Sequence, residues 1–114
     1  MPKIRINSIH CNTPDEVDKD EIYLKNDGKK IWPNGDLYHR VDTSDTVDVG
    51  VELNLNSDWA EIELWDFDYM SLNDKLGVFK MKVDGFSGKY TVSLQEVSEK
   101  STASYFMNWE ILED

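Results

Sequence analysis

Short runs in which apolar and polar residues alternate recur along the chain, and they constrain its fold more than any other feature. After Gly50, apolar residues occupy every second position as far as Leu55, and similar alternation runs through residues 60–65 and 103–111. A period of two is typical of a strand with one buried face. No window of about 11 residues or more shows a clean helical period. The sequence therefore predicts an all-β protein.

Turn residues divide the chain into about eight predicted strands. Asn26-Asp27-Gly28 is a hairpin turn, because these residue types tolerate positive φ, and the sequence Pro33-Asn34-Gly35 ends the returning strand. The predicted strands cover 3–9, 22–25, 29–32, 51–55, 60–65, 78–83, 90–94 and 103–111, with weak strand character at 38–41. Regular strand spacing in 114 residues favours a single domain, residues 1–114, folded as a sandwich or barrel.

Acidic residues dominate the charge. There are 23 Asp and Glu against 12 Lys and Arg, which gives a formal net charge of −11. Such a surface repels phosphates, so nucleic acid is not an expected partner, and an anionic membrane is expected to need a bridging cation. The excess charge can serve solubility alone, or some of the carboxylates can coordinate a hard cation.

Several other classes of protein are disfavoured. Cys11 is the single cysteine, so no intramolecular disulfide forms, and a buried, inert thiol is expected. Cys11, His10 and His39 are too few for a zinc site. The start of the sequence has no apolar run of signal-peptide length, and no segment approaches the roughly 20 apolar residues of a membrane span. We therefore expect a soluble, cytoplasmic protein, and the absence of a recognisable catalytic motif predicts that it is not an enzyme.

The most informative segment runs from Asp66 to Asp74. An alternating strand leads into Asp66 and Asp68, which can converge because alternate residues of an extended chain point to one side. The chain then turns and returns at Asp74, so the three carboxylates can surround one Ca²⁺ ion. Such a pattern also arises by chance in an acidic chain. An EF-hand fits poorly, because Met70 and Ser71 would occupy its fifth ligand position and its glycine position.

The flanking residues add a family resemblance. The run Trp-Asp-Phe-Asp-x-x-Ser-x-Asn-Asp-x-Leu-Gly, which begins at Trp65, resembles the third calcium-binding loop of C2 domains. The segment 20–25 is similar to the motif that opens the second C2 strand, and the order of elements agrees over most of the chain. This resemblance implies an eight-stranded antiparallel Greek-key β-sandwich.

The resemblance also implies a set of metal ligands in two loops. Asp66, Asp68 and Asp74, together with the carbonyl of Phe67, match the third-loop ligands, and Ser71 and the Leu72 carbonyl match weaker ones. The first loop departs from the family pattern, because Asn7 or Ser8 stands where an aspartate is usual. Its second aspartate stays open among the following three candidates: Asp15, Asp18 and Asp20.

The tip of the loop between Asp66 and Asp74 is predicted to be a contact surface. Tyr69 and Met70 are apolar and are expected to be exposed there. The sequence thus predicts a non-enzymatic Ca²⁺-binding C2-like module that docks on a phospholipid headgroup or on a protein. The alternative is a structural or protein-interaction sandwich of a larger assembly, in which calcium is only stabilising or absent.

Overall fold

The fold is described from a computed structural model, which covers residues 3–15, 19–83, 87–97 and 102–112. Strands account for most of these residues, and the part of the chain covered contains no helix. The strands are β1 (Lys3–Thr13), β2 (Asp20–Asn26), β3 (Lys29–Trp32), β4 (His39–Val41), β5 (Thr46–Asn54), β6 (Trp59–Asp66), β7 (Asp74–Lys82), β8 (Gly88–Ser93), β9 (Gln95–Glu96) and β10 (Ser104–Leu112).

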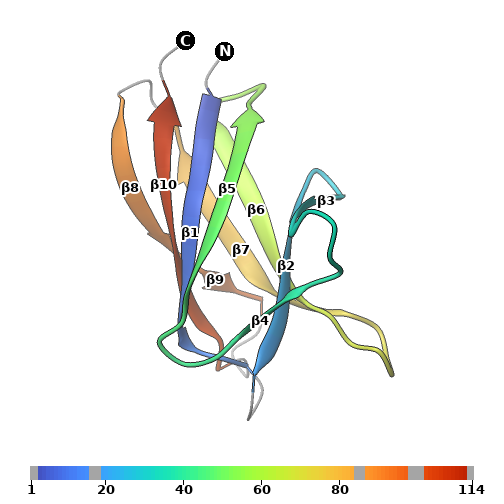
Figure 1. Cartoon of the computed structure of the whole chain (residues 1–114). Coiled ribbons are helices and arrows are strands. Elements are labelled where there is room, and N and C mark those ends of the chain that lie inside the picture. Colours follow the sequence, from blue (N-terminus) through green and yellow to red (C-terminus); the bar gives the residue numbers. More distant parts are fainter. Residues whose placement is uncertain (1–2, 16–18, 84–86, 98–101, 113–114) are drawn as a thin grey trace.

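Two antiparallel sheets form the sandwich (Figure 1). The first sheet has the order β5-β1-β10-β8, and the second has the order β3-β2-β6-β7-β9, with β4 also paired to β2. The predicted all-β antiparallel sandwich is therefore confirmed. The predicted number of strands is wrong, because the described residues form ten strands rather than eight. The additional strands, β4 and β9, have three and two residues, too few for alternation to be recognised.

The core lies between the sheets and is built by the alternating strands. Every second residue of β10 from Tyr105 to Ile111 is buried, and so is every second residue of β6 from Ala60 to Asp66. Phe79 on β7 has no exposed surface, and burying a side chain of this size stabilises the fold by about 2–3 kcal/mol. Buried side chains of β6 and β7 belong to this core, and these two strands flank residues 67–73.

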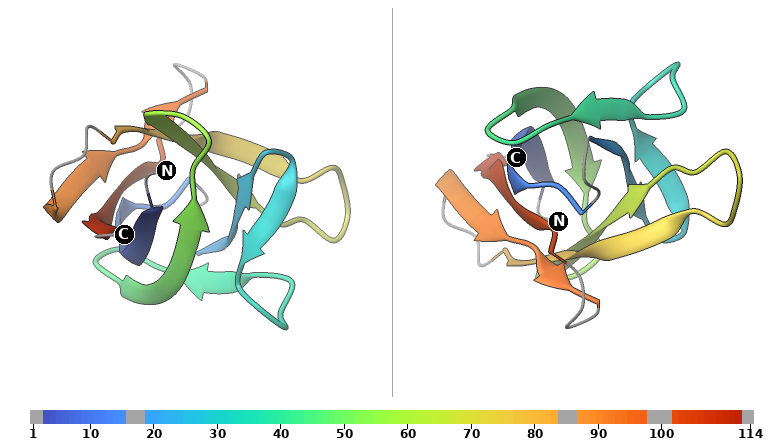
Figure 2. Two further views of the ribbon diagram at one scale, coloured as in Figure 1. Left: turned by 90° about the horizontal axis from the view of Figure 1, so that it is seen from above. Right: turned by 90° about the horizontal axis from the view of Figure 1, so that it is seen from below.

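The ends of the sandwich differ. The start of β1, the end of β10 and the β5–β6 turn lie at one end, whereas the long connection between β6 and β7 projects from the lower part of the molecule in Figure 1. In both views of Figure 2 this loop, drawn in yellow, extends beyond the body of the sandwich. Residues 67–73, here called the aspartate loop, thus project away from the core.

Candidate functional site

The base of the aspartate loop is fixed by strand pairing. Asp66 ends β6 and Asp74 begins β7, and the two residues are directly opposite each other in the antiparallel pair. Directly opposed residues place their side chains on the same face of a sheet, with Cβ atoms about 5 Å apart. The register therefore brings together two of the predicted ligands, Asp66 and Asp74.

Asp66 also ties the loop to β2. Its side chain is only 3% exposed, and its Oδ1 atom accepts a hydrogen bond of 2.9 Å from the backbone N–H of Glu21. The N–H of Phe67 in turn donates to the Glu21 carbonyl at 2.7 Å. A buried carboxylate that accepts a backbone N–H is well stabilised. Asp66 therefore links the end of β6 to β2 by a hydrogen bond, and it is also a candidate metal ligand.

Asp68 organises the loop itself. Its Oδ1 accepts the backbone N–H of Met70 at 2.8 Å, and its Oδ2 accepts the hydroxyl of Ser71 at 2.7 Å. The N–H of Met70 and the Ser71 hydroxyl lower the pKa of Asp68, because both stabilise the charged form. The ionised Asp68 carboxylate therefore stabilises the folded state at pH values above the ordinary pKa of an aspartate. This stabilisation is lost as the pH falls through the lowered pKa of the folded protein.

Asn73 closes the loop on the side of β7. Its Oδ1 accepts the N–H of Asp68 at 2.9 Å, and its Nδ2 donates to the Tyr23 hydroxyl at 2.9 Å. The side chain of Asn73 thus spans from the loop to β2, which explains why a short amide suits this position.

The second acidic segment enters the core. Asp20 has no exposed surface, and its Oδ2 accepts hydrogen bonds from the Asp15 N–H, at 2.8 Å, and from the Tyr105 hydroxyl. Burial, reinforced by the hydrogen bond to Asp20, raises the pKa of Tyr105 far above its usual range. Of the three first-loop candidates, Asp20 is thus a buried acceptor and Asp15 is half-buried beside it, while Asp18 lies outside the described residues.

Cys11 lies next to this network and yields a pH-dependent prediction. Burial raises the pKa of its thiol to about 11, with Asp20 acting in the same direction and a hydrogen bond to Tyr105 opposing it. The thiol of the folded protein therefore stays protonated to a higher pH than the thiol of the unfolded chain. The contribution of this group to the free energy of unfolding is present below the ordinary pKa of a thiol and is lost as the pH rises towards 11. We expect iodoacetamide to leave Cys11 unmodified at pH 8 and to alkylate it at once in denaturant, as measured by mass spectrometry. Rapid alkylation of the folded protein would contradict this burial.

The aspartates do not form a preassembled metal cage. Within residues 3–15, 19–83, 87–97 and 102–112, no group of three or more His, Cys, Asp or Glu side chains is arranged to hold a metal ion. Asp66 and Asp68 turn towards backbone N–H groups, whereas Asp74 is exposed. The two weaker predicted donors belong to the same loop: the Ser71 hydroxyl is bound to Asp68, and the Leu72 carbonyl lies 3.4 Å from Ser71 Oγ.

The tip of the aspartate loop presents large apolar side chains. Tyr69, Met70 and Leu72 are 68%, 92% and 89% exposed. Behind the tip, Phe67 and Tyr69 pack against Tyr38 of the β3–β4 connection. Sequence reasoning missed the roles of Tyr38 and Glu21. Tyr38 belongs to no recognisable motif, Glu21 lies in the 20–25 segment without a predicted role, and both meet the loop only through the fold.

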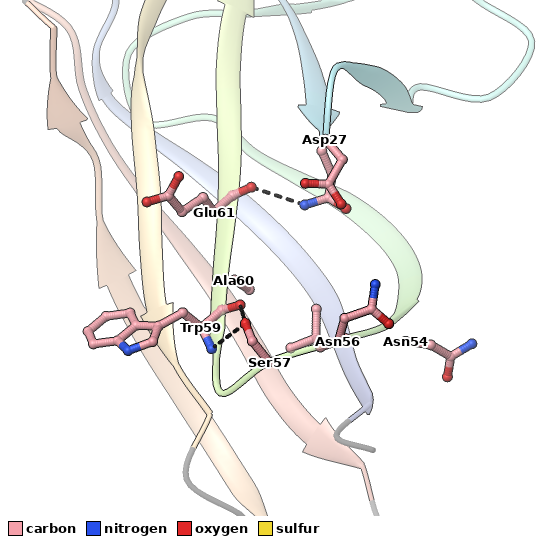
Figure 3. Close-up of a pocket in the computed structure, with 9 residues that line it drawn as sticks. Asp27, Asn54, Asn56, Ser57, Trp59, Ala60 and Glu61 are labelled. Carbon is pink, nitrogen blue, oxygen red and sulfur yellow. Dashed lines mark hydrogen bonds between the residues drawn. The ribbon is translucent and has the colours of Figure 1, made fainter.

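A polar hollow of about 410 Å³ lies elsewhere, between the β2–β3 hairpin and the β5–β6 turn. The amide of Asn26 donates to the Glu61 carbonyl at 3.1 Å across it. Figure 3 shows that the side chains of Trp59 and Glu61 point away from the amides of Asn54 and Asn56, on the other side of β6. The Trp59 indole therefore does not line the hollow on the side of these amides. The end of the sandwich that carries the aspartate loop is the stronger candidate for a functional site.

Comparisons with known proteins support the fold. No protein-family model matches the chain, and no curated protein matches its sequence. Among solved structures, a C2 domain of plant extended synaptotagmin 1 matches 99% of this chain over 94% of its own length, with a TM-score of 0.59 and 9% sequence identity. The chain has a C2-like fold. At this identity the likeness concerns the fold alone, so the predicted C2-like sandwich is confirmed and the predicted ligands remain predictions. No helix among the described residues is long and apolar enough to cross a membrane.

Proposed function

We propose that this chain is a non-enzymatic binding module that docks on another surface through its aspartate loop, and that Ca²⁺ bound by the neighbouring aspartates controls the docking. The observation that carries the proposal is the construction of the loop. Its base places Asp66 opposite Asp74, and its tip exposes Tyr69, Met70 and Leu72. Exposed apolar side chains on a braced loop are typical of a contact surface.

The chemistry of the oxygen donors fits Ca²⁺. Carboxylates and carbonyls are the ligands of this hard cation, and each ionised carboxylate has about four lone-pair positions, so the two hydrogen bonds that Asp68 accepts leave positions for a metal. The residues that would hold the ion are those of the two acidic segments: Asp66, Phe67 (by its carbonyl), Asp68 and Asp74, with Ser71 and Leu72 as weaker donors and Asp15, Asp18 and Asp20 from the first. When bound, Ca²⁺ supplies positive charge at this end of an acidic protein.

Titration calorimetry with Ca²⁺ tests the proposal. The unmodified chain is expected to give a binding isotherm and a higher melting temperature at millimolar calcium. Asp68→Asn and Asp74→Asn each remove a charged donor and are expected to weaken binding by about tenfold or more. Asp48→Asn is the matched control, because Asp48 is exposed on β5. Absence of both heat and thermal stabilisation in the unmodified protein would overturn the role of calcium.

A calcium-independent interaction module is the second candidate, and one observation favours it. Asp20, Asp66 and Asp68 already accept hydrogen bonds within the protein, so these three carboxylates have partners without a metal. Co-sedimentation with phospholipid vesicles, in calcium and in chelator, separates the candidates. Pelleting only with calcium supports calcium-controlled docking on lipid, pelleting in both conditions supports the calcium-independent module, and no pelleting in either condition points to a protein partner.

A further inference from the structure

A second hollow lies beside the aspartate loop, at its contact with the β3–β4 connection. It measures about 400 Å³ and is lined by Gly35, Asp36, Leu37, Tyr38 and Tyr69. Leu37 and Tyr69 are both more than half exposed, so solutes can reach it. The hollow joins two segments that are far apart in the sequence and combines tyrosine rings with a carboxylate.

Three aromatic rings support this hollow in a right-angled arrangement. Tyr38 and Phe67 are stacked, with centroids 5.3 Å apart and planes inclined by 26°. Tyr69 stands across both of them, at 87° to Tyr38 and 86° to Phe67, with centroid distances of 6.2 and 4.8 Å. Walls at right angles present a ring face and a ring edge to the same space, and an aromatic face attracts a cation placed within about 6 Å of its centroid.

Negative charge lies behind the rings. The Glu21 Oε2 atom is buried and has no hydrogen-bond partner, and within the described ranges no ion pair involves Glu21. The backbone carbonyl of Glu21 accepts the N–H of Phe67 at 2.7 Å, which places Glu21 beside this ring cluster. A buried carboxylate oxygen without a partner is costly. A nearby cation would offset that cost.

We propose that this hollow binds a choline-type trimethylammonium cation against the rings of Tyr38 and Tyr69 that line it, with Glu21 and Asp36 nearby supplying the opposing charge. A methylated ammonium carries no N–H donors, so it leaves water more easily than a lysine ammonium and gains more from ring faces. The Lys30 ammonium group donates to the backbone carbonyl of Asp36, so one protein cation lies beside this lining residue, and the ligand is expected on the side of the two tyrosines. The net charge of −11 also favours a cationic ligand.

This cation site rests on the proposed docking function, because Tyr69 belongs to the docking loop. Binding of the cation does not require calcium. The same cation occurs in free choline compounds and in the headgroup of phosphatidylcholine. A surface of phosphatidylcholine has no net charge, so it does not repel this acidic protein as an anionic membrane does. Met70 and Leu72 next to the hollow would then contact the apolar part of that interface.

The direct test is an NMR titration with choline chloride in the presence of a calcium chelator. We expect saturable shifts of the Tyr38 and Tyr69 ring signals, and no comparable shifts with sodium chloride or with 3,3-dimethylbutan-1-ol, which has the shape of choline without its charge. Tyr69→Leu and Glu21→Gln are each expected to weaken binding by about fivefold or more. Tyr90→Leu is the control, because Tyr90 stacks on Trp109 in the other sheet.

The outcomes separate this inference from the proposed function. Absence of saturable shifts, or equal shifts with the uncharged isostere, would overturn the cation site even if calcium binds elsewhere in the loop. Given binding, vesicles of phosphatidylcholine in chelator identify the source. If the protein pellets with these vesicles and excess free choline abolishes the pelleting, the ligand is the lipid headgroup. If the protein binds choline but does not pellet, the ligand is a soluble choline compound. Vesicles of phosphatidylglycerol serve as the anionic control and are expected not to pellet the protein.

Discussion

Replacing Asp20 with alanine is expected to lower the free energy of unfolding by about 4 kcal/mol. Asp20 is fully buried and accepts hydrogen bonds from the Tyr105 hydroxyl and the Asp15 N–H. Alanine would leave both donors without this acceptor and would create a cavity beside them. Urea unfolding in the presence of a chelator, followed by tryptophan fluorescence, measures the change without any contribution from bound metal.

Two comparisons show whether the hydrogen bonds cause the effect. Tyr105→Phe removes one donor and keeps the ring, so we expect a loss of about 1.5–3 kcal/mol. In a double-mutant cycle, Asp20→Ala and Tyr105→Phe should couple, because the second change costs little once the first has removed the acceptor. Asp48→Ala on β5 should stay within about 0.5 kcal/mol of the unmodified chain. A loss below about 1 kcal/mol for Asp20→Ala would contradict a structural role for this carboxylate.

Asp20 also illustrates what the sequence could not distinguish. In the sequence it is one of three candidate first-loop ligands, of which Asp15 has the spacing closest to the family pattern. Its role as a buried acceptor depends on Tyr105, which is 85 residues away in the sequence. The same limit applies to Glu21, whose backbone binds Asp66 across 45 residues, and to Tyr38, which meets Tyr69 across 31 residues. Such pairs are set by strand order, which local patterns do not encode.

The strands themselves were largely predictable, because alternation reflects burial of one face. The pattern of β6 and β10 is nearly perfect, with buried and less buried residues in turn. The prediction was less accurate for β5, which begins at Thr46 rather than near Val51. Its first residues are acidic and polar on the outer face, and Gly50 with a φ of 71° interrupts the regular strand. As an edge strand of its sheet, β5 needs polar residues there to discourage pairing with other chains.

The position of the aspartate loop was predictable from the sequence, but the roles of its aspartate side chains were only partly predictable. The order strand, Asp66, loop, Asp74, strand follows directly from the alternation and the polar residues between. The spacing could not show that Asp68 would bind the Met70 N–H and the Ser71 hydroxyl. A carboxylate can accept from its own loop or from a metal, and the sequence pattern is the same in both cases. Titration with calcium is therefore the measurement that decides between these roles.

Gly77→Ala is expected to cost about 3 kcal/mol or more, although it adds a single methyl group. A Cβ atom at this position would lie 2.3 Å from the backbone carbonyl oxygen of Gln95 and 2.8 Å from Leu94 Cγ. Gly77 pairs with Glu96, so the close approach is the contact between β7 and β9. Because a backbone atom cannot rotate away, β9 would have to separate from β7. Circular dichroism during thermal unfolding should show a lower melting temperature.

The cause of the Gly77 effect can be tested against a second glycine and a second substitution. Gly35 has a φ of 85°, and an added methyl group there would meet no heavy atom within 4 Å, so Gly35→Ala should cost only about 1 kcal/mol, from backbone strain. Adding Leu94→Ala to Gly77→Ala removes the side-chain clash but leaves the Gln95 carbonyl in place, so stability should not recover. Recovery in that double variant would show that the side chain, rather than the β7–β9 backbone contact, requires glycine in the Leu-Gly exit of the aspartate loop.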